Sequence, residues 1–203
     1  IAAKITGIER RIYHNHGIPF IGYKGMLKWI LYFLELLNCC FASDVITVSK
    51  GMLRIYGKMF PANFNVKLPN PGSACGLPES YYVDLESMMS IKSAKKKKNG
   101  FSDDIIFMYV GRSIERKGLL IAIQAFELYN QKFGNSKLFL AGCSKKDLMN
   151  SGISNQNIIP LGFVVDLSTN YLISDVVLLP SIHEGFGYSL LEGAANGNAL
   201  ISS

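Results

Sequence analysis

Short apolar runs alternate with longer, helix-periodic stretches along this chain, and the alternation falls into two blocks. Apolar runs rich in β-branched residues predict strands, whereas apolar positions that recur every three or four residues predict helices. The first block predicts strands at 10–14, 44–48 and 65–69, with helices at 24–41 and from Lys50. The second block predicts strands at 105–110, 137–141, 157–163 and 175–180, helices at 119–133, 166–173 and 187–197, and a last strand from Ala199. This order predicts two doubly wound α/β units, each a parallel sheet covered by helices.

The two predicted units are residues 1–83 and 104–203, and a poorly periodic, Lys-rich segment, 84–103, separates them. The chain has 203 residues, of which 49% are hydrophobic and 18% charged, so disorder and coiled coil are excluded. At about 150 residues per domain, this length accommodates one domain and part of another. We therefore expect both domains to be incomplete in this sequence, and the run ALISS at its end indicates a strand still in progress.

The net charge of +6 suggests an anionic partner, which could be nucleic acid, acidic lipid or a phosphorylated small molecule. The placement of the charge along the chain distinguishes among these partners. Four of the basic residues form the run Lys95–Lys98, and without that run only a mild excess remains. We interpret the run as part of a solvated linker, with contact to an acidic membrane surface as the second interpretation. Nucleic acid is disfavoured, because no zinc-ligand spacing, RNP-like aromatic motif or basic helix accompanies the charge.

One segment, Gly25–Phe41, is apolar enough to be compared with a membrane span. It is only about 17 residues long and carries Lys28 and Glu35, which predicts a buried helix instead.

The cysteines show neither the spacing of a zinc site nor that of a disulfide framework. They are Cys39, Cys40, Cys75 and Cys143. This usage indicates a reducing compartment, so we expect a cytoplasmic protein.

Ligands of open α/β sheets bind outside the carboxyl ends of the strands, so the residues after each predicted strand are the first candidates for a site. The strand at 105–110 is followed by GRSIERKG, in which Gly111 permits a tight turn. Arg112 and Lys117 stand at the start of the next helix, where two cations and free backbone amides suit a diphosphate. The glycine spacing is neither that of a Walker A loop nor that of a dinucleotide fingerprint.

The strand at 175–180 leads into EGFGYSLLE, which carries two glutamates separated by seven residues. Gly185 and Gly187 flank Phe186 and let backbone amides approach a ligand just ahead of a helix. Glu184 lies in the predicted loop and Glu192 about a turn and a half into the helix, so the two carboxylates can address different parts of one extended ligand. Carboxylates accept hydrogen bonds from sugar hydroxyls, although a helix-terminus carboxylate and a surface glutamate are the simpler interpretations.

Taken in order, these motifs resemble the retaining nucleotide-sugar glycosyltransferases of the GT-B fold, the large group 1 type family that includes bacterial glycan-assembly enzymes. The matching elements are YVGRSIERKGLLIAIQAF, the LAG at 140–142, LGFV at 161–164 and VLLPSIHEGFGYSLLEGAANGNALISS. The first block resembles the later part of the family's acceptor-side domain through HNHGIPF, DVITVS and LPNPGS, which are less specific. The resemblance implies a GT-B architecture of two Rossmann-like domains, with residues 104–203 as the donor-binding domain.

The resemblance also implies roles for the two cations. Arg112 and Lys117 would hold the donor diphosphate and neutralise the leaving group as its bond to the sugar breaks. No metal and no further cofactor are then needed, which agrees with the lack of a DxD-type motif in a strand-end loop; Asp103 and Asp104 are adjacent and precede a strand.

Further roles are implied for the carboxylates and for one histidine. Glu184 would bind hydroxyls of the transferred sugar, with the amides of 185–187 nearby, and Glu192 would bind the ribose hydroxyls of the nucleotide. His16 matches a family histidine that reaches the donor sugar, and His14 is the rival candidate. A structural histidine remains an alternative for either position.

The implied reaction transfers a sugar from a nucleotide diphosphate sugar to a hydroxyl acceptor with retention, in polysaccharide or glycolipid assembly. The acceptor can be lipid-linked, which would place the protein peripherally at the inner face of the membrane. A non-catalytic sugar-nucleotide-binding protein and a nucleotide-sugar epimerase or hydrolase of the same fold are the alternatives. The family commonly has Pro where this chain has Asn198, a difference that touches no proposed ligand group.

A full enzyme of this family needs about 150 or more further residues. We therefore expect these 203 residues alone to bind a donor weakly and not to turn over.

Overall fold

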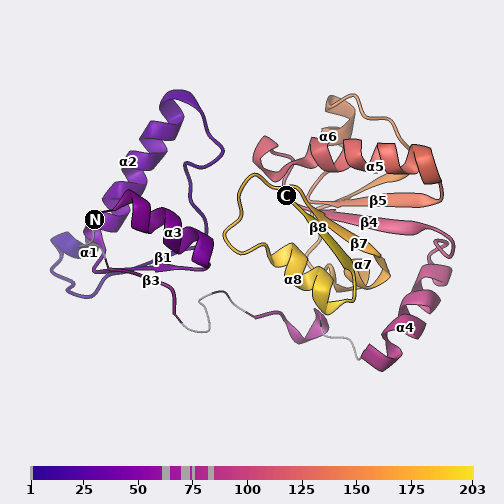
Figure 1. The fold of residues 1–203 in the computed structure, drawn as a ribbon, viewed down its shortest axis with the longest axis horizontal. Helices are drawn as coiled ribbons and strands as arrows, with labels where there is room; N and C mark the ends of the chain where they lie inside the picture. The colour runs from indigo at the N-terminus through magenta and orange to yellow at the C-terminus, as the bar shows by residue number, and fades with distance from the viewer. Residues whose placement is uncertain (1, 61–64, 70–73, 75, 82–84) are drawn as a thin grey trace. The chain divides into compact units, whose positions relative to one another are not determined.

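The computed structural model describes residues 2–60, 65–69, 74, 76–81 and 85–203. Their contacts divide the chain into two units (Figure 1). Unit 1 comprises Ile1–Gly76 together with His183–Phe186, and unit 2 comprises Leu77–Ile182 together with Gly187–Ser203. The domain boundary predicted after residue 83 lies within residues 82–84, which are outside the described residues, whereas the contacts divide the chain after Gly76. Residues 70–73 of the LPNPGS motif are also outside the described residues.

Unit 1 is built on a small parallel sheet in the order β1-β2-β3. Its elements are α1 (Ala2–Ile5), β1 (Ile12–Asn15), α2 (Gly25–Phe41), β2 (Asp44–Thr47), α3 (Lys50–Met59) and β3 (Val66–Lys67). Ser49 caps α3, because its hydroxyl accepts the Met52 N–H. Cys39, Val45 and Tyr56 are buried in the core that joins the helices to the sheet. The strands and helices predicted for this block are confirmed. Helix α1 was not predicted.

Helix α2 is present as predicted, but the prediction that it is buried is wrong for this unit. Met26 and Trp29 are 79% and 67% exposed, and Phe33 is 56% exposed. Only Glu35 and Cys39 of this helix are buried. The physical reason is the size of the sheet, since three short strands cover one stripe of a 17-residue helix and leave the rest in contact with solvent. None of the helices in the described ranges combines the length and hydropathy needed to cross a bilayer.

Unit 2 contains a parallel five-stranded sheet in the order β6-β5-β4-β7-β8. The strands are β4 (Ile105–Val110), β5 (Ser136–Ala141), β6 (Ile158–Gly162), β7 (Val176–Leu179) and β8 (Ala199–Ser202). The helices are η1 (Glu79–Tyr81), α4 (Leu85–Lys98), η2 (Glu115–Lys117), α5 (Leu119–Phe133), α6 (Lys145–Asn150), α7 (Ser168–Ile173) and α8 (Tyr188–Ala195). All strands predicted for this block are confirmed, and the strand order reverses beside β4, which is the mark of a doubly wound sheet.

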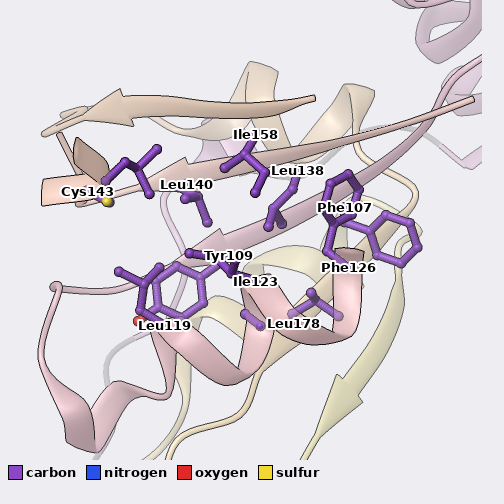
Figure 2. Close-up of a cluster of buried hydrophobic side chains, with 12 residues drawn as sticks. Phe107, Tyr109, Leu119, Ile123, Phe126, Leu138, Leu140, Cys143, Ile158 and Leu178 are labelled. Atoms are coloured by element: carbon purple, nitrogen blue, oxygen red, sulfur yellow. The ribbon is translucent and has the colours of Figure 1, made fainter. Parts of the chain in front are cut away.

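Both faces of this sheet are buried, as the apolar strands predict. Helices α5 and α6 lie on one face and α7 and α8 on the other (Figure 1). Figure 2 shows the core on the α5 side, where Phe107 and Tyr109 of β4 point toward Ile123 and Phe126 of α5. Alternate β4 residues, such as Met108, are buried on the opposite face. The sheet is therefore a rigid platform for the loops at its carboxyl edge.

The Lys-rich segment 84–103, expected to be a solvated linker, contains helix α4. Lys92 and Lys96 each form an ion pair with Asp175, which directly precedes β7, at 3.0 and 2.8 Å. Lys96 also donates to the Asp104 carbonyl, and Asp175 accepts the Ile106 N–H at 2.8 Å. One lysine of the run Lys95–Lys98, Lys96, thus joins Lys92 in attaching helix α4 to the sheet of unit 2, while Lys97 and Lys98 are exposed as expected.

We expect Asp175→Asn to destabilise the protein by about 2 kcal/mol at neutral pH, since the ion pairs to α4 are lost. Burial by itself would raise the pKa of Asp175, but the Ile106 amide and the two lysines outweigh burial and lower that pKa. A carboxylate with a lowered pKa stabilises the fold above its unfolded pKa of about 3.9, and this contribution disappears as the pH falls through the lower folded-state pKa. Urea unfolding at pH 7 and pH 3 should show the difference between wild type and variant shrinking at pH 3.

The exposed Asp103→Asn change is the matched control for this prediction. It alters the same functional group two residues ahead of β4 and should leave stability nearly unchanged at both pH values. A loss as large as that of Asp175→Asn would show that the α4 ion pairs are not the cause.

Candidate functional site

The carboxyl ends of β4, β5 and β6 in unit 2 are joined by hydrogen bonds from glycine backbones. The Gly111 N–H donates to the Ala141 carbonyl at 3.0 Å, and the Gly142 N–H donates to the Gly162 carbonyl at 2.7 Å. The loops after β4, β5 and β6 are thereby held edge to edge at the position where α/β sheets bind ligands.

The predicted phosphate turn, Gly111–Gly118, wraps around the hydroxyl of Tyr109. That hydroxyl lies 3.3 Å from both the Arg112 carbonyl and the Lys117 carbonyl, and it donates to this pair of acceptors. Gly111 packs directly on it, because a Cβ at this position would lie 2.9 Å from the Tyr109 oxygen. Arg112 is exposed and Lys117 is half-buried. The structure therefore brings the two predicted cations together on one short, internally braced turn.

The same turn is attached to the end of β7. The Ile182 N–H donates to the Arg116 carbonyl at 2.9 Å. Gly118, which ends η2 and begins α5 with φ 70°, lies so close to Pro180 that a Cβ would be 2.0 Å from the Pro180 carbonyl oxygen. The segment that enters the EGFGYSLLE motif is thus fixed to the segment that carries Arg112 and Lys117.

A cavity of about 630 Å³ lies beside this turn. Ser113, Glu115, Gly118, Gln124 and Ser151 are among its lining residues. Arg112 and Lys117 do not line it, so we do not assign the donor phosphates to this cavity.

Glu192 occupies the fifth residue of α8, as predicted, but it is not an ordinary surface glutamate. It is half-buried, and the hydroxyl of Tyr171 donates to its Oε2 at 2.6 Å. Burial raises the pKa of Glu192, and the hydrogen bond from Tyr171 partly offsets that rise. Tyr171 is fully buried in α7 beneath it, so the carboxylate is held in one orientation.

Asn198, where the family commonly has Pro, contributes to the support of α8. Its Nδ2 donates to the carbonyls of Tyr171 and Gly193 at 2.9 and 3.1 Å. The Asn196 side chain donates to the Glu192 carbonyl at 2.9 Å. The departure from the family pattern thus supplies a side-chain tie between α7 and α8 at the base of the Glu192 helix.

The two candidate histidines lie in unit 1 at the carboxyl end of β1. His14 is in the strand and His16 directly follows it; both are exposed, and their rings pack with centroids 4.3 Å apart. The structure therefore does not separate the two candidates by exposure. Position favours His16, because it lies in the loop after the strand.

The segment His183–Phe186 belongs to unit 1. Gly185 is buried against the backbone of His16, since a Cβ at 185 would lie 1.9 Å from the His16 carbonyl oxygen. Glu184 is half-buried, and Phe186 is 44% exposed. The structure thus brings Glu184, Gly185 and Phe186 together with His16 in unit 1, and Gly111, Arg112, Lys117, Gly187 and Glu192 lie in unit 2.

Gly187 marks the start of α8. It is the N-cap residue with φ 77° and ψ 52°, a left-handed conformation that glycine adopts without strain. Its carbonyl accepts the Leu190 N–H at 3.0 Å. The helix therefore begins one residue later than the pattern predicts, at Tyr188.

Over the described ranges, no group of His, Cys, Asp and Glu side chains has the arrangement of a metal site. Cys39, Cys40 and Cys143 are free thiols, and Cys75 lies outside the described residues.

Tyr109 and Tyr171 were not among the predicted site residues. Tyr109 stands in an otherwise aliphatic and aromatic strand, IIFMYV, and Tyr171 in the short helix before β7. A tyrosine in a buried strand requires a partner for its hydroxyl, which is the one signal in the sequence that points to such a role.

A doubly wound parallel sheet with these loops at its carboxyl edge is the architecture of GT-B glycosyltransferases, and comparison with solved structures shows the same fold. HepE from Anabaena, in complex with UDP-glucose, matches 99% of this chain and 56% of its own, with 19% identity and a TM-score of 0.72. WaaG, a glycosyltransferase involved in lipopolysaccharide biosynthesis, matches 99% of this chain and 61% of its own, with 18% identity and a TM-score of 0.69.

The chain belongs to the family described as glycosyl transferases group 1, whose family model matches residues 91–203. The capsular polysaccharide biosynthesis glycosyltransferase CapM of Staphylococcus aureus is 27% identical over 203 residues, 96% of this chain and 52% of CapM. The putative glycosyltransferase EpsD of Bacillus subtilis is 24% identical over 95% of this chain and 51% of its own length. The chain thus spans about half the length of each of these relatives.

Proposed function

We propose that the full-length protein is a glycosyltransferase that moves a sugar from a nucleotide diphosphate sugar to a hydroxyl acceptor with retention, without a metal ion. The observation that carries the proposal is the braced turn holding Arg112 and Lys117 beside β7, in a chain of the glycosyl transferases group 1 family. The similarity to HepE, which was solved with UDP-glucose, supports a nucleotide sugar as the donor.

Arg112 and Lys117 are proposed to bind the donor diphosphate. As the bond between the anomeric carbon and the phosphate oxygen breaks, negative charge develops on the departing diphosphate. Two fixed cations stabilise that charge more strongly in the transition state than in the bound donor, and this difference is what accelerates the reaction. The Tyr109 hydroxyl keeps their backbones in place, so little reorganisation is needed when the charge develops.

The remaining residues are proposed to position the donor. Glu184 accepts hydrogen bonds from hydroxyls of the transferred sugar, with the amides of 185–187 nearby, and is a positioning group and not a covalent nucleophile. Glu192 accepts hydrogen bonds from the ribose hydroxyls. His16 contacts the donor sugar. A nucleophile on the protein is not required, because retention can result from attack on the same face as the departing phosphate.

The acceptor is proposed to be a growing glycan or glycolipid, in keeping with the polysaccharide role that the name of CapM states. A lipid-linked acceptor would require approach to the inner face of the membrane. The exposed Met26, Trp29 and Phe33 of α2, beside Lys24 and Lys28, suit such an approach.

The proposal is tested on the complete reading frame by measuring the release of free nucleoside diphosphate from a panel of nucleotide sugars. Release from one donor, abolished by Glu184→Ala, supports a donor-cleaving enzyme, and product analysis then separates transfer from hydrolysis or epimerisation. Donor binding without release, in the presence of glycan and glycolipid acceptors, would indicate the non-catalytic sugar-nucleotide-binding protein instead.

We expect Tyr171→Phe to weaken binding of the nucleoside diphosphate about 5-fold, because one hydrogen bond that orients Glu192 contributes about 1 kcal/mol. The loss of affinity should depend on the ribose hydroxyls, because these are the groups that Glu192 is proposed to bind. Isothermal titration with the nucleotide and with its 2′-deoxy analogue should show a smaller preference for the ribonucleotide in the variant.

Tyr81→Phe is the matched control, since Tyr81 is buried against Tyr171 with ring centroids 5.9 Å apart. It removes a hydroxyl from the same cluster and leaves the bond from Tyr171 to Glu192 in place. Equal preference for the ribonucleotide in wild type and Tyr171→Phe would contradict the role given to Glu192.

A further inference from the structure

Glu35 is a carboxylate buried in unit 1, and a hydrogen-bond network takes the place of a salt bridge around it. It lies in the middle of α2 and is 1% exposed. In the part of the chain that the structure describes, no ion pair joins it to a lysine or arginine. Glutamate is almost never fully buried unless it is paired, because removal of its charge from water is costly. Its burial therefore calls for a specific role.

Three side chains donate to this carboxylate. The Tyr13 hydroxyl donates to Oε2 at 2.9 Å, the Asn15 amide donates to Oε1 at 2.8 Å, and the Tyr56 hydroxyl also donates to Oε1. Burial, with the nearby Glu35 charge adding to it, raises the pKa of Tyr13 to about 12, so this phenol remains a donor at physiological pH. Two of the three donors come from β1 and the third from α3.

The network continues from Asn15 into the loop that carries His16. Asn15 is 3% exposed, and its Oδ1 accepts the Gly17 N–H at 2.8 Å. The residues on both sides of His16 are therefore tied to one side chain, whose other end is held by Glu35. Asn15 has its amide oriented by this arrangement, since its nitrogen must face the carboxylate and its oxygen must face the loop.

We propose that Glu35 is a positioning residue that fixes the His16 loop through Asn15, and that it thereby sets how His16 meets the donor sugar. The inference rests on the proposed function, because it takes the contact between His16 and the donor from there. Glu35 itself lies in the core and acts only through Asn15 and the backbone of Gly17.

Glu35→Gln is the sharpest probe, because glutamine has the same shape but a different pattern of donors and acceptors. Each carboxylate oxygen accepts at least one hydrogen bond. A glutamine NH₂ group facing Tyr13 would confront a hydroxyl that already accepts from Asn15, whose Nδ2 lies 3.0 Å from it. Turned the other way, the NH₂ group would face the Asn15 amide, donor against donor. In the first orientation the bond from Asn15 persists, but it ends on a neutral amide oxygen, which is a weaker acceptor than a carboxylate oxygen. In the second orientation the bond is lost. The tie to Asn15 is therefore weakened or broken with almost no change in volume.

The experiment combines structure and kinetics on the full-length protein. Hydrogen exchange at the Gly17 amide is measured in wild type, in Glu35→Gln and in the control Cys39→Ala, which alters another buried residue of α2 without removing a donor to Glu35. Turnover is measured for Glu35→Gln, His16→Ala and the double variant, with the donor that the panel identifies.

We expect Glu35→Gln to accelerate exchange at Gly17, whereas Cys39→Ala leaves it near the wild-type rate. We expect kcat to fall about 10- to 100-fold in Glu35→Gln with little change in nucleoside diphosphate affinity, the size of effect that misplacement of a catalytic group produces. In the His16→Ala background the same change should have almost no further effect, because the group that it positions is gone.

Unchanged exchange at Gly17 in Glu35→Gln would overturn the proposal, as would a loss of turnover that multiplies with that of His16→Ala. The exchange measurement needs no substrate. If no donor is cleaved by the wild type, the proposed function fails, while accelerated exchange at Gly17 still supports the positioning of the loop by Glu35.

Discussion

Arg112→Ala in the full-length protein is expected to lower the kcat for nucleoside diphosphate release by about 10²- to 10³-fold, the loss that follows removal of one group that stabilises a developing negative charge. Arg112 stands on a turn that is braced by Tyr109 and attached to the end of β7, so the alanine variant should retain the turn and lose only the guanidinium. The affinity for the donor should change much less than kcat, because the charge that Arg112 meets is largest in the transition state. Steady-state release of nucleoside diphosphate, with kcat and KM determined separately, measures the effect.

The control for Arg112→Ala is Lys145→Ala, which removes an exposed positive charge at the start of α6 in the same unit. It lowers the net charge of unit 2 by the same amount and should leave kcat unchanged. A wild-type kcat in Arg112→Ala would remove the main support for the proposed chemistry, and an equal loss of kcat in both variants would show that the effect of Arg112 is not specific to its position.

Gly118→Ala is expected to destabilise the protein by about 3 kcal/mol, from crowding of about 1 to 3 kcal/mol and a left-handed backbone that costs a side chain about 1 to 2 kcal/mol. The residue has φ 70°, and a Cβ would lie 2.0 Å from the carbonyl oxygen of Pro180. That neighbour is backbone at the end of β7, so it cannot turn aside as a flexible side chain would. The turn must then move away from β7, and donor binding should weaken with it. Urea unfolding gives the change in the free energy of unfolding.

Gly152→Ala separates the two contributions. Gly152 has φ 68°, nearly the same as Gly118, but no atom lies within 4 Å of a Cβ built there. Gly152→Ala should therefore lower the free energy of unfolding only by the cost of the left-handed backbone, about 1 to 2 kcal/mol, and should leave donor binding unchanged. Equal losses in both variants would mean that the close approach to Pro180 contributes nothing.

The local pattern of apolar residues was sufficient to predict the strands of the sheet in unit 2 and their burial. Strands such as IIFMYV are so apolar that burial on both faces is the only arrangement that removes them from water, and the structure confirms it. Helix α4 was not predicted because its hydrophobic pattern is weak and its last four residues are all lysines. Helix α4 is attached to unit 2 by the ion pairs of Lys92 and Lys96 with Asp175. Asp175 lies 83 residues after Lys92 and 79 residues after Lys96, so no local sequence pattern contains these ion pairs.

The residues proposed for the site were chosen from the sequence, but the side chains that support them were not. Arg112, Lys117 and Glu192 stand after strands or in a helix that follows one, so topology alone places them at the carboxyl edge. The hydroxyls of Tyr109 and Tyr171 depend on how β4 and α7 pack, which is decided by tertiary contacts. Glu35 was noted only as a charge that argues against a membrane span, and its three donors come from residues 20 or more positions away.

Trp29 is the only tryptophan in this chain, and it projects from α2 with 67% of its surface exposed. Its fluorescence should therefore have the red-shifted maximum of a hydrated indole, and it should be readily quenched by iodide. Unit 2 contributes no indole signal from this chain, so its unfolding has to be followed by circular dichroism. Anything that covers α2, whether lipid or protein, would shift the emission to the blue without any added label.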